Sequence, residues 1–176
     1  MQNNAAETRK WSEIKGLAAV SIDTGTKMGT INDFYFDEQS NTIRAFLIKT
    51  GLFGHRVLLA SSIHSVGADA ITFAHENMLI KEGDKKELST LVMGHSLLAF
   101  RVLSESGNVV GTVGNILLDT STPATMRIIS FEMAGGLLEN ISKRFSVFAA
   151  DQVTRYGQDV IVISDAAAQD LNKGKS

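Results

Sequence analysis

The chain has 176 residues, of which 44% are hydrophobic, and its 17 Lys and Arg against 19 Asp and Glu give a net charge of −2. This apolar content supports a packed core, whereas the near-neutral balance provides no overall field that would gather nucleic acid. The absence of cysteine excludes disulfides and thiolate metal sites. The polar beginning lacks the apolar region of a secretory signal, and no stretch reaches the roughly 18 apolar residues that a spanning helix needs. We therefore expect a soluble, cytoplasmic protein.

The first half of the chain, after a polar lead over residues 1–11, predicts a series of short β-strands. Apolar stretches alternate with turns rich in Gly, Asp, Ser and Asn, which is the pattern of β-hairpins. The expected strands are Leu17–Ile22, Gly29–Asp37, Ile43–Ile48, Arg56–Leu59 and Ile71–Phe73. The charged residues 81–93 that follow read as a linker, with a short helix expected over Asp84–Leu91.

The second half repeats this pattern. Six positions of Gly29–Asp37 match six positions of Gly111–Asp119 at one offset, since 111 − 29 and 119 − 37 are both 82. Later matches, such as Arg56 with Arg144, lie further apart where loops lengthen. A repeat of this kind indicates two copies of one supersecondary unit. The expected strands of the second copy are Leu97–Leu103, Gly111–Asp119, Met126–Met133, Phe145–Phe148 and Val160–Ile163.

About five short strands with Gly-rich turns in each copy favour a small barrel per copy. The predicted fold is therefore mainly β, with two tandem small barrels and a short C-terminal helix. The expected domains are a lead over 1–11, copy 1 over 12–80, a charged linker over 81–93, copy 2 over 94–164, and a helix with its tail over 165–176.

Acidic residues at equivalent positions of the two copies have a structural explanation. Asp37 and Asp119 each precede a polar turn, where a side-chain oxygen can accept a bond from the backbone N–H two residues further on. At the position of Asp33 the second copy has Asn115, which keeps the hydrogen-bonding capacity and loses the charge. A structural role tolerates that exchange and a general base does not.

Four segments of copy 1 carry a resemblance to a known family: Ser12–Leu17, Gly29–Asp37, Arg56–Leu59 and Gly67–Thr72. They resemble the PRC-barrel family, which is named for the cytoplasmic domain of the photosynthetic reaction-centre H subunit. The family is also similar to the C-terminal domain of a ribosome-maturation factor. The resemblance extends over Ser12–Phe73 and Leu97–Ile163, so it implies two tandem PRC-type barrels. It implies an adaptor role, in which the barrel docks on another macromolecule.

Residue patterns typical of catalysis are missing from the sequence. His55, His64, His75 and His95 do not stand at metal-ligand spacing, and Gly94–Leu98 lacks the final Gly of a nucleophile elbow and precedes a strand. We therefore expect no enzymatic activity, no catalytic residues, no metal site and no cofactor. A cation site remains an alternative, because carboxylates are hard-cation ligands that can converge in space. Its candidate residues are Asp33, Asp37, Glu38 and Asp69.

Two apolar loops are the candidate recognition sites. Thr50–Arg56 and Ala134–Arg144 place large apolar residues among glycines and cations. Such loops are either lids that plug the barrels or pack them together, or docking patches with an apolar centre and a polar rim. Trp11 is a smaller candidate with the same two interpretations. The candidate partner-binding residues are Leu52, Phe53, His55, Arg56, Leu137, Leu138, Ile141, Lys143 and Arg144.

The sequence thus predicts a non-enzymatic adaptor or scaffold that binds a macromolecular partner. The partner expected is a protein, and the resemblance to the reaction-centre subunit allows a membrane face as the setting. One alternative is a ribosome- or RNA-associated assembly factor, although the net charge and the 7% aromatic content argue against direct RNA contact. A small-ligand or metal-binding protein is the other alternative.

Overall fold

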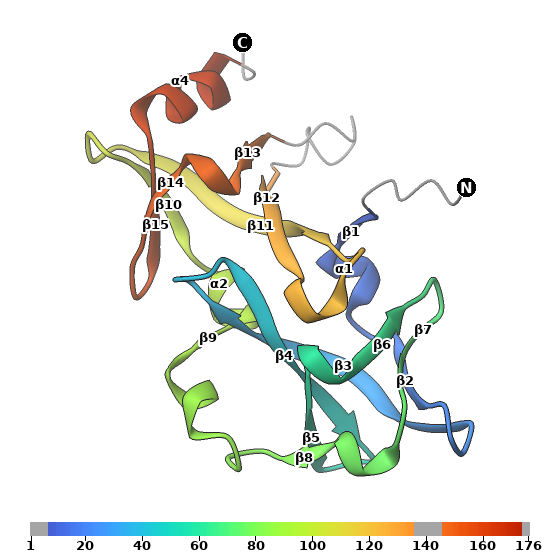
Figure 1. Ribbon diagram of the computed structural model, residues 1–176. Helices are drawn as coiled ribbons and strands as arrows, with labels where there is room; N and C mark the ends of the chain where they lie inside the picture. Colours follow the sequence, from blue (N-terminus) through green and yellow to red (C-terminus); the bar gives the residue numbers. More distant parts are fainter. Residues whose placement is uncertain (1–6, 136–145, 174–176) are drawn as a thin grey trace. The chain divides into compact units, whose positions relative to one another are not determined.

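The computed structural model describes residues 7–135 and 146–173. They fall into two compact units (Figure 1). Unit 1 is Met1–Gly94 together with Leu118–Arg127, and unit 2 is His95–Leu117 together with Ile128–Ser176. The protein is mainly β and ends in a short helix, which confirms the predicted fold class.

The elements up to Gly94 are β1 (Thr8–Lys10), α1 (Trp11–Ile14), β2 (Ala18–Ser21), β3 (Thr26–Asp37), β4 (Thr42–Thr50), β5 (Gly54–Leu59), η1 (Ala60–Ser62), β6 (Ile63–Val66), β7 (Ala70–Phe73), η2 (Glu76–Met78), β8 (Ile80–Lys81), η3 (Lys86–Thr90) and β9 (Val92–Met93). The elements that follow are α2 (Gly94–Leu97), β10 (Arg101–Ser104), β11 (Val109–Asp119), η4 (Pro123–Thr125), β12 (Arg127–Met133), β13 (Val147–Ala149), η5 (Ala150–Gln152), β14 (Val153–Tyr156), β15 (Val160–Ile163) and α4 (Asp165–Lys173). The elements labelled η are short 3₁₀ helices of three to five residues.

Unit 1 is a curled sheet with the strand order β6-β7-β2-β3-β4-β5. Its neighbouring strands are antiparallel except β2 and β7, which run parallel with Ala18 opposite Ala70. Bulges interrupt the β2–β3 and β3–β4 pairings, and such irregularities increase the local twist of a sheet. The enclosed face is filled by large apolar side chains, among them Phe34, Phe36, Phe46 and Phe73.

Trp11 closes this core from the short helix α1. Its side chain is 3% exposed, lies edge-on to Phe34 at 4.8 Å between ring centroids, and stacks parallel to Phe46 at 6.1 Å. Burial of an aromatic ring in such a pair stabilises the core by more than its area alone. Of the two interpretations of Trp11, the structure supports the core role.

The outer face of the same sheet carries a second apolar cluster, covered by residues 80–93, which we call the cover segment. This cluster joins Tyr35, Ala45, Leu47 and Val57 of the sheet to Leu88 of the cover segment. Two short pairings fix the segment at its ends: Val57 lies opposite Ile80, and Tyr35 lies opposite Met93. The residues expected to form a charged linker therefore pack on unit 1, with their charges exposed and Leu88 buried.

Unit 2 contains the same sequence of pairings. Its strands follow the order β14-β15-β10-β11-β12, with β13 paired to β12. Here too one pairing is parallel. β10 runs parallel to β15, with Arg101 opposite Val160, as β2 runs parallel to β7 in unit 1. The β10–β11 pairing has an irregularity after Val102, as the β2–β3 pairing has after Ala19.

Unit 1 is built from two separate parts of the chain. The Ile43 N–H donates to the Met126 carbonyl at 2.8 Å, and the Thr120 N–H donates to the Glu7 carbonyl at 3.0 Å. Arg127 pairs with Thr42 of β4, and Met126 is fully buried. The stretch Leu118–Arg127 therefore completes unit 1, although it is remote in sequence.

Candidate docking site

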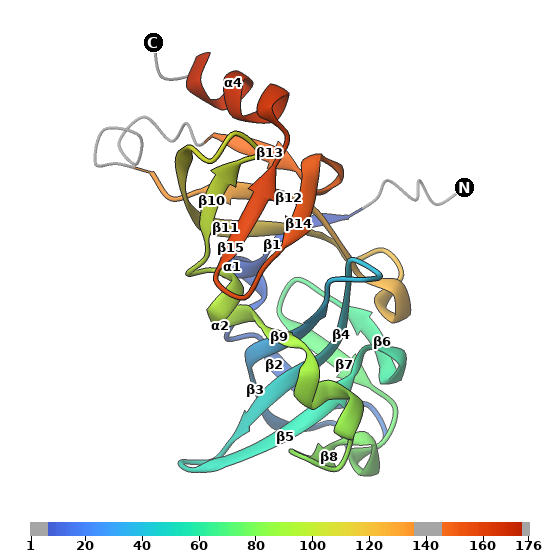
Figure 2. The same cartoon turned by 90° about the vertical axis from the view of Figure 1, so that its left-hand side faces the viewer.

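The most exposed large apolar residues among those described lie at the turn between β4 and β5. Leu52 is 84% exposed and Phe53 is 94% exposed. With Gly51 they form the hairpin tip, a three-residue turn closed by the pairing of Thr50 with Gly54. Figure 2 shows this hairpin, in turquoise at the lower left, extending away from the rest of unit 1. The interpretation of Leu52 and Phe53 as a barrel lid is wrong, because a lid would be buried.

The two glycines of the loop explain why the tip has this shape. Gly51 has a φ of 63°, a left-handed conformation that L side chains rarely adopt. A Cβ on Gly54 would lie 2.5 Å from Thr50 Oγ1 and 2.7 Å from the Thr50 carbonyl oxygen, which is closer than atoms can approach. The tight turn places Leu52 and Phe53 at its outer end, where both side chains are exposed.

Cationic side chains follow the tip on both strands of the hairpin. Lys49 lies opposite His55 in the β4–β5 pairing, and Arg56 lies opposite Lys81 of β8. Lys49, Arg56 and Lys81 are exposed, and His55 is half-buried. Arg56 also donates from Nη1 to the His55 carbonyl at 2.9 Å, which holds its guanidinium beside the strand. The structure thus brings the apolar tip and the basic residues His55 and Arg56 together on one hairpin.

The remaining candidate partner-binding residues lie outside the described part of the chain. They are Leu137, Leu138, Ile141, Lys143 and Arg144. The candidate docking site is accordingly the β4–β5 hairpin alone.

The four histidines do not form a metal centre. His64, His75 and His95 are exposed, and within residues 7–135 and 146–173 no group of three or more His, Cys, Asp and Glu residues is placed to hold a metal ion. His75 Nδ1 lies 3.3 Å from Asp23 Oδ2, and the Ser21 hydroxyl donates to Asp23 Oδ1. The Ser21 bond is the main cause that lowers the pKa of Asp23, and His75 lowers it further. Here the carboxylate lies between Ser and His, so the histidine cannot act as the base for this serine.

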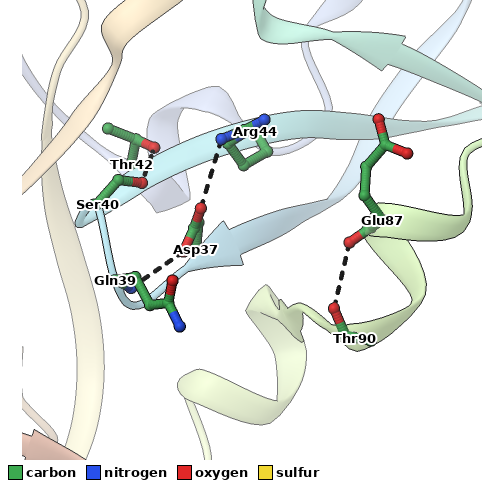
Figure 3. A network of polar contacts seen from close by, with 7 residues as sticks. All are labelled: Asp37, Gln39, Ser40, Thr42, Arg44, Glu87 and Thr90. Carbon is green, nitrogen blue, oxygen red and sulfur yellow. Dashed lines mark hydrogen bonds and ion pairs between the residues drawn. The ribbon is translucent and has the colours of Figure 1, made fainter.

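The paired aspartates form the predicted turns. The Gln39 N–H donates to Asp37 Oδ1 at 3.0 Å, and the Ser121 N–H donates to Asp119 Oδ1 at 3.0 Å. Figure 3 shows the first of these turns, in which Arg44 also contacts Asp37 at 3.4 Å between Nη1 and Oδ2. At the second turn, the Ser121 hydroxyl and N–H lower the pKa of the Asp119 carboxyl. Both carboxylates therefore serve local structure, as the sequence indicated.

The alternative cation site is not assembled. Asp33 is buried in β3, where it accepts the Phe34 N–H at 2.9 Å. Asp37 is engaged by Arg44, whereas Glu38 and Asp69 are exposed in different turns. These carboxylates are not among any metal-holding group of the described residues.

Two features of the site were missed by sequence reasoning. The sequence does not indicate Lys49 and Lys81, because their place beside the tip depends on strand register. In the cover segment the charged residues outnumber the apolar ones, and this composition favours a linker. A sequence signal existed in Ile80, Leu88, Leu91 and Met93, which interrupt the charged stretch.

Among the described residues, no helix is both long and apolar enough to cross a membrane.

The fold and the hairpin define a class of protein: a mainly β module built on a curled sheet, with an exposed apolar hairpin tip. Residues 6–74 match the family model of the PRC-barrel domain. The match confirms the family resemblance for the first copy. A search of curated proteins found no match.

Proposed function

We propose that this protein is a non-enzymatic adaptor that binds a macromolecular partner through the hairpin tip. The observation that carries the proposal is the exposure of Leu52 and Phe53, adjacent apolar side chains at the end of a projecting hairpin. Isolated exposed apolar residues are ordinary, but an adjacent Leu and Phe with a rim of cations has the composition of an interface centre. The sequence favours a protein as this partner, either in solution or at a membrane face.

We also propose that unit 2 is a second PRC-type barrel, so that the chain is a tandem repeat. Matching strand orders and parallel pairings in the two units support this. Further support comes from Asp33 and Asn115, which each accept the N–H of the following residue, at 2.9 and 3.0 Å. A repeat gives an adaptor two related surfaces, of which one carries the Leu52-Phe53 tip.

The proposed function is tested by capturing partners with the whole chain and with the double variant Leu52→Ser, Phe53→Ser. Both side chains are exposed, so the variant should keep the melting temperature of the parent. We expect the variant to lose proteins that the parent retains after chemical cross-linking. Ile22→Ser is the matched control, because Ile22 is 50% exposed at another turn of unit 1. Identical capture by all three proteins would contradict an adaptor role for the tip.

A further inference from the structure

We infer that the hairpin tip binds directly to a membrane surface that contains anionic phospholipids. In the bound state, Leu52 and Phe53 enter the headgroup region, and the cations of the hairpin contact lipid phosphates and carboxylates. This inference rests on one premise of the proposed function, that the exposed tip is a docking site, and it assigns a direct ligand to that tip. Three properties of the hairpin carry it: its shape, its charge and the chemistry of its two outer residues.

The shape of the tip suits a fluid interface better than a rigid pocket. Leu52 and Phe53 are the two outer residues of a three-residue turn, so they form a convex point. A protein partner would need a concave pocket of matching form to bury them. A lipid interface needs no preformed pocket, because headgroups and acyl chains rearrange around an inserted apolar group, and affinity follows the apolar area buried.

The charge of the hairpin is opposite to that of the whole chain. Residues 42–59, which span β4, the tip and β5, contain Arg44, Lys49, His55 and Arg56 and no Asp or Glu, while the full chain has a net charge of −2. Lys81 adds a cation beside Arg56, and the exposed Glu82 that follows it is the acidic neighbour in sequence. The ion pairs of the described residues do not involve Lys49, Arg56 or Lys81. No carboxylate of the described residues therefore competes as an ion-pair partner of these cations with an anionic surface.

The two contributions together set the expected affinity. Two apolar side chains at an interface give weak, reversible binding, as a single short anchor does. Each Lys or Arg near an anionic membrane increases the binding constant about fivefold. This gain decreases with distance from the membrane over about one Debye length, and it is lost at high salt. The tip should therefore bind anionic membranes reversibly and neutral membranes hardly at all.

The experiment measures co-sedimentation of the whole chain with vesicles of phosphatidylcholine alone or with phosphatidylserine added. We expect binding to the phosphatidylserine vesicles, weakened by salt. Leu52→Ser with Phe53→Ser should reduce it about tenfold or more. Lys49→Gln with Arg56→Gln should reduce it about 25-fold at low salt. Arg101→Gln with Arg155→Gln removes two exposed cations of unit 2 and should leave it unchanged. Binding that all three double variants share equally would overturn the inference.

Insertion of the tip has its own spectroscopic readout. The chain has one tryptophan, Trp11, which is buried and gives a constant background. In a Phe53→Trp variant, added phosphatidylserine vesicles should shift the new emission to the blue, and brominated lipid should quench it. Emission that stays unchanged while the protein sediments would contradict insertion by the tip.

The outcomes separate this inference from the proposed function. If vesicles are not bound but a protein is captured through Leu52 and Phe53, the adaptor role stands and lipid is not the ligand. If vesicles are bound through the tip and no tip-dependent protein is captured, the lipid contact stands and the adaptor role fails.

Discussion

At the scale of single residues, Asp33 and Asn115 perform one task with different charges. Each side chain is in a strand and accepts the N–H of the next residue, that of Phe34 in one unit and that of Ile116 in the other. Asp33 is buried, so the hydrogen bond that its side-chain oxygen accepts contributes to the local structure of β3. The equivalence explains why the second unit can have an uncharged amide where the first has a carboxylate, since both side chains supply an acceptor oxygen.

Asp33→Asn should therefore be nearly silent, because the amide oxygen can accept the same bond. We expect the free energy of unfolding to change by less than about 1 kcal/mol. Asp33→Leu has a similar shape and no acceptor, and should cost about 1–3 kcal/mol by leaving the Phe34 N–H unsatisfied. Urea unfolding followed by Trp11 fluorescence measures both. If Asn is as destabilising as Leu, the charge itself is required and the two positions are not equivalent.

At the scale of elements, the cover segment turns the outer face of the β3–β4–β5 sheet into a second core. Tyr35, Leu47 and Val57 would otherwise face water on that side. Burial within this cluster raises the pKa of the Tyr35 hydroxyl, and the nearby Glu82 carboxylate raises it further. The charged residues of the segment are exposed to water, whereas Leu88 packs on the sheet.

Leu88→Ser should destabilise unit 1 because it removes the buried side chain of the cover segment. By comparison with other large-to-small core substitutions, we expect a loss of about 2–5 kcal/mol. Leu52→Ser is the matched control, since the same exchange at the exposed tip should change stability by less than about 0.5 kcal/mol. The free energies come from urea unfolding read by Trp11 fluorescence. Equal stability of the two variants would show that the segment behaves as a free linker.

The sequence predicted local structure well and long-range structure poorly. The Asp37 and Asp119 contacts and most of the expected strands follow from patterns within ten residues and are present. The strand expected over Leu97–Leu103 is wrong in its first part, because Gly94–Leu97 forms the helix α2 and β10 covers Arg101–Ser104. At Gly29 a Cβ would lie too close to the Lys49 carbonyl oxygen, so glycine permits the close approach of two backbones there. The cover segment and the cations Lys49 and Lys81 depend instead on which strands pair and in which register. The helix expected over Asp84–Leu91 is a 3₁₀ turn over Lys86–Thr90, because two strand pairings fix its flanks.

At the scale of the whole molecule, the boundary between repeats in the sequence is not the boundary between units in space. Leu118–Arg127 belongs to the second repeat by its pattern and to unit 1 by its contacts. Within unit 1 it supplies the carbonyl of Met126 to Ile43 and the N–H of Thr120 to Glu7. A chain divided at the repeat boundary would therefore lose part of its first unit.

A fragment of residues 1–94 should for this reason be less stable than unit 1 in the whole chain. It lacks Met126, whose full burial is worth about 1.5–3 kcal/mol, and the backbone partners of Ile43 and Glu7. Trp11 is present in both proteins, so its fluorescence in urea reports unit 1 in each, and the fragment should unfold at the lower concentration. Because a fragment can fail for other reasons, Met126→Ser in the whole chain is the second measurement, with an expected loss of about 2–5 kcal/mol. Unfolding of the fragment and of the whole chain at one urea concentration, with Met126→Ser silent, would mean that residues 7–94 form unit 1 by themselves.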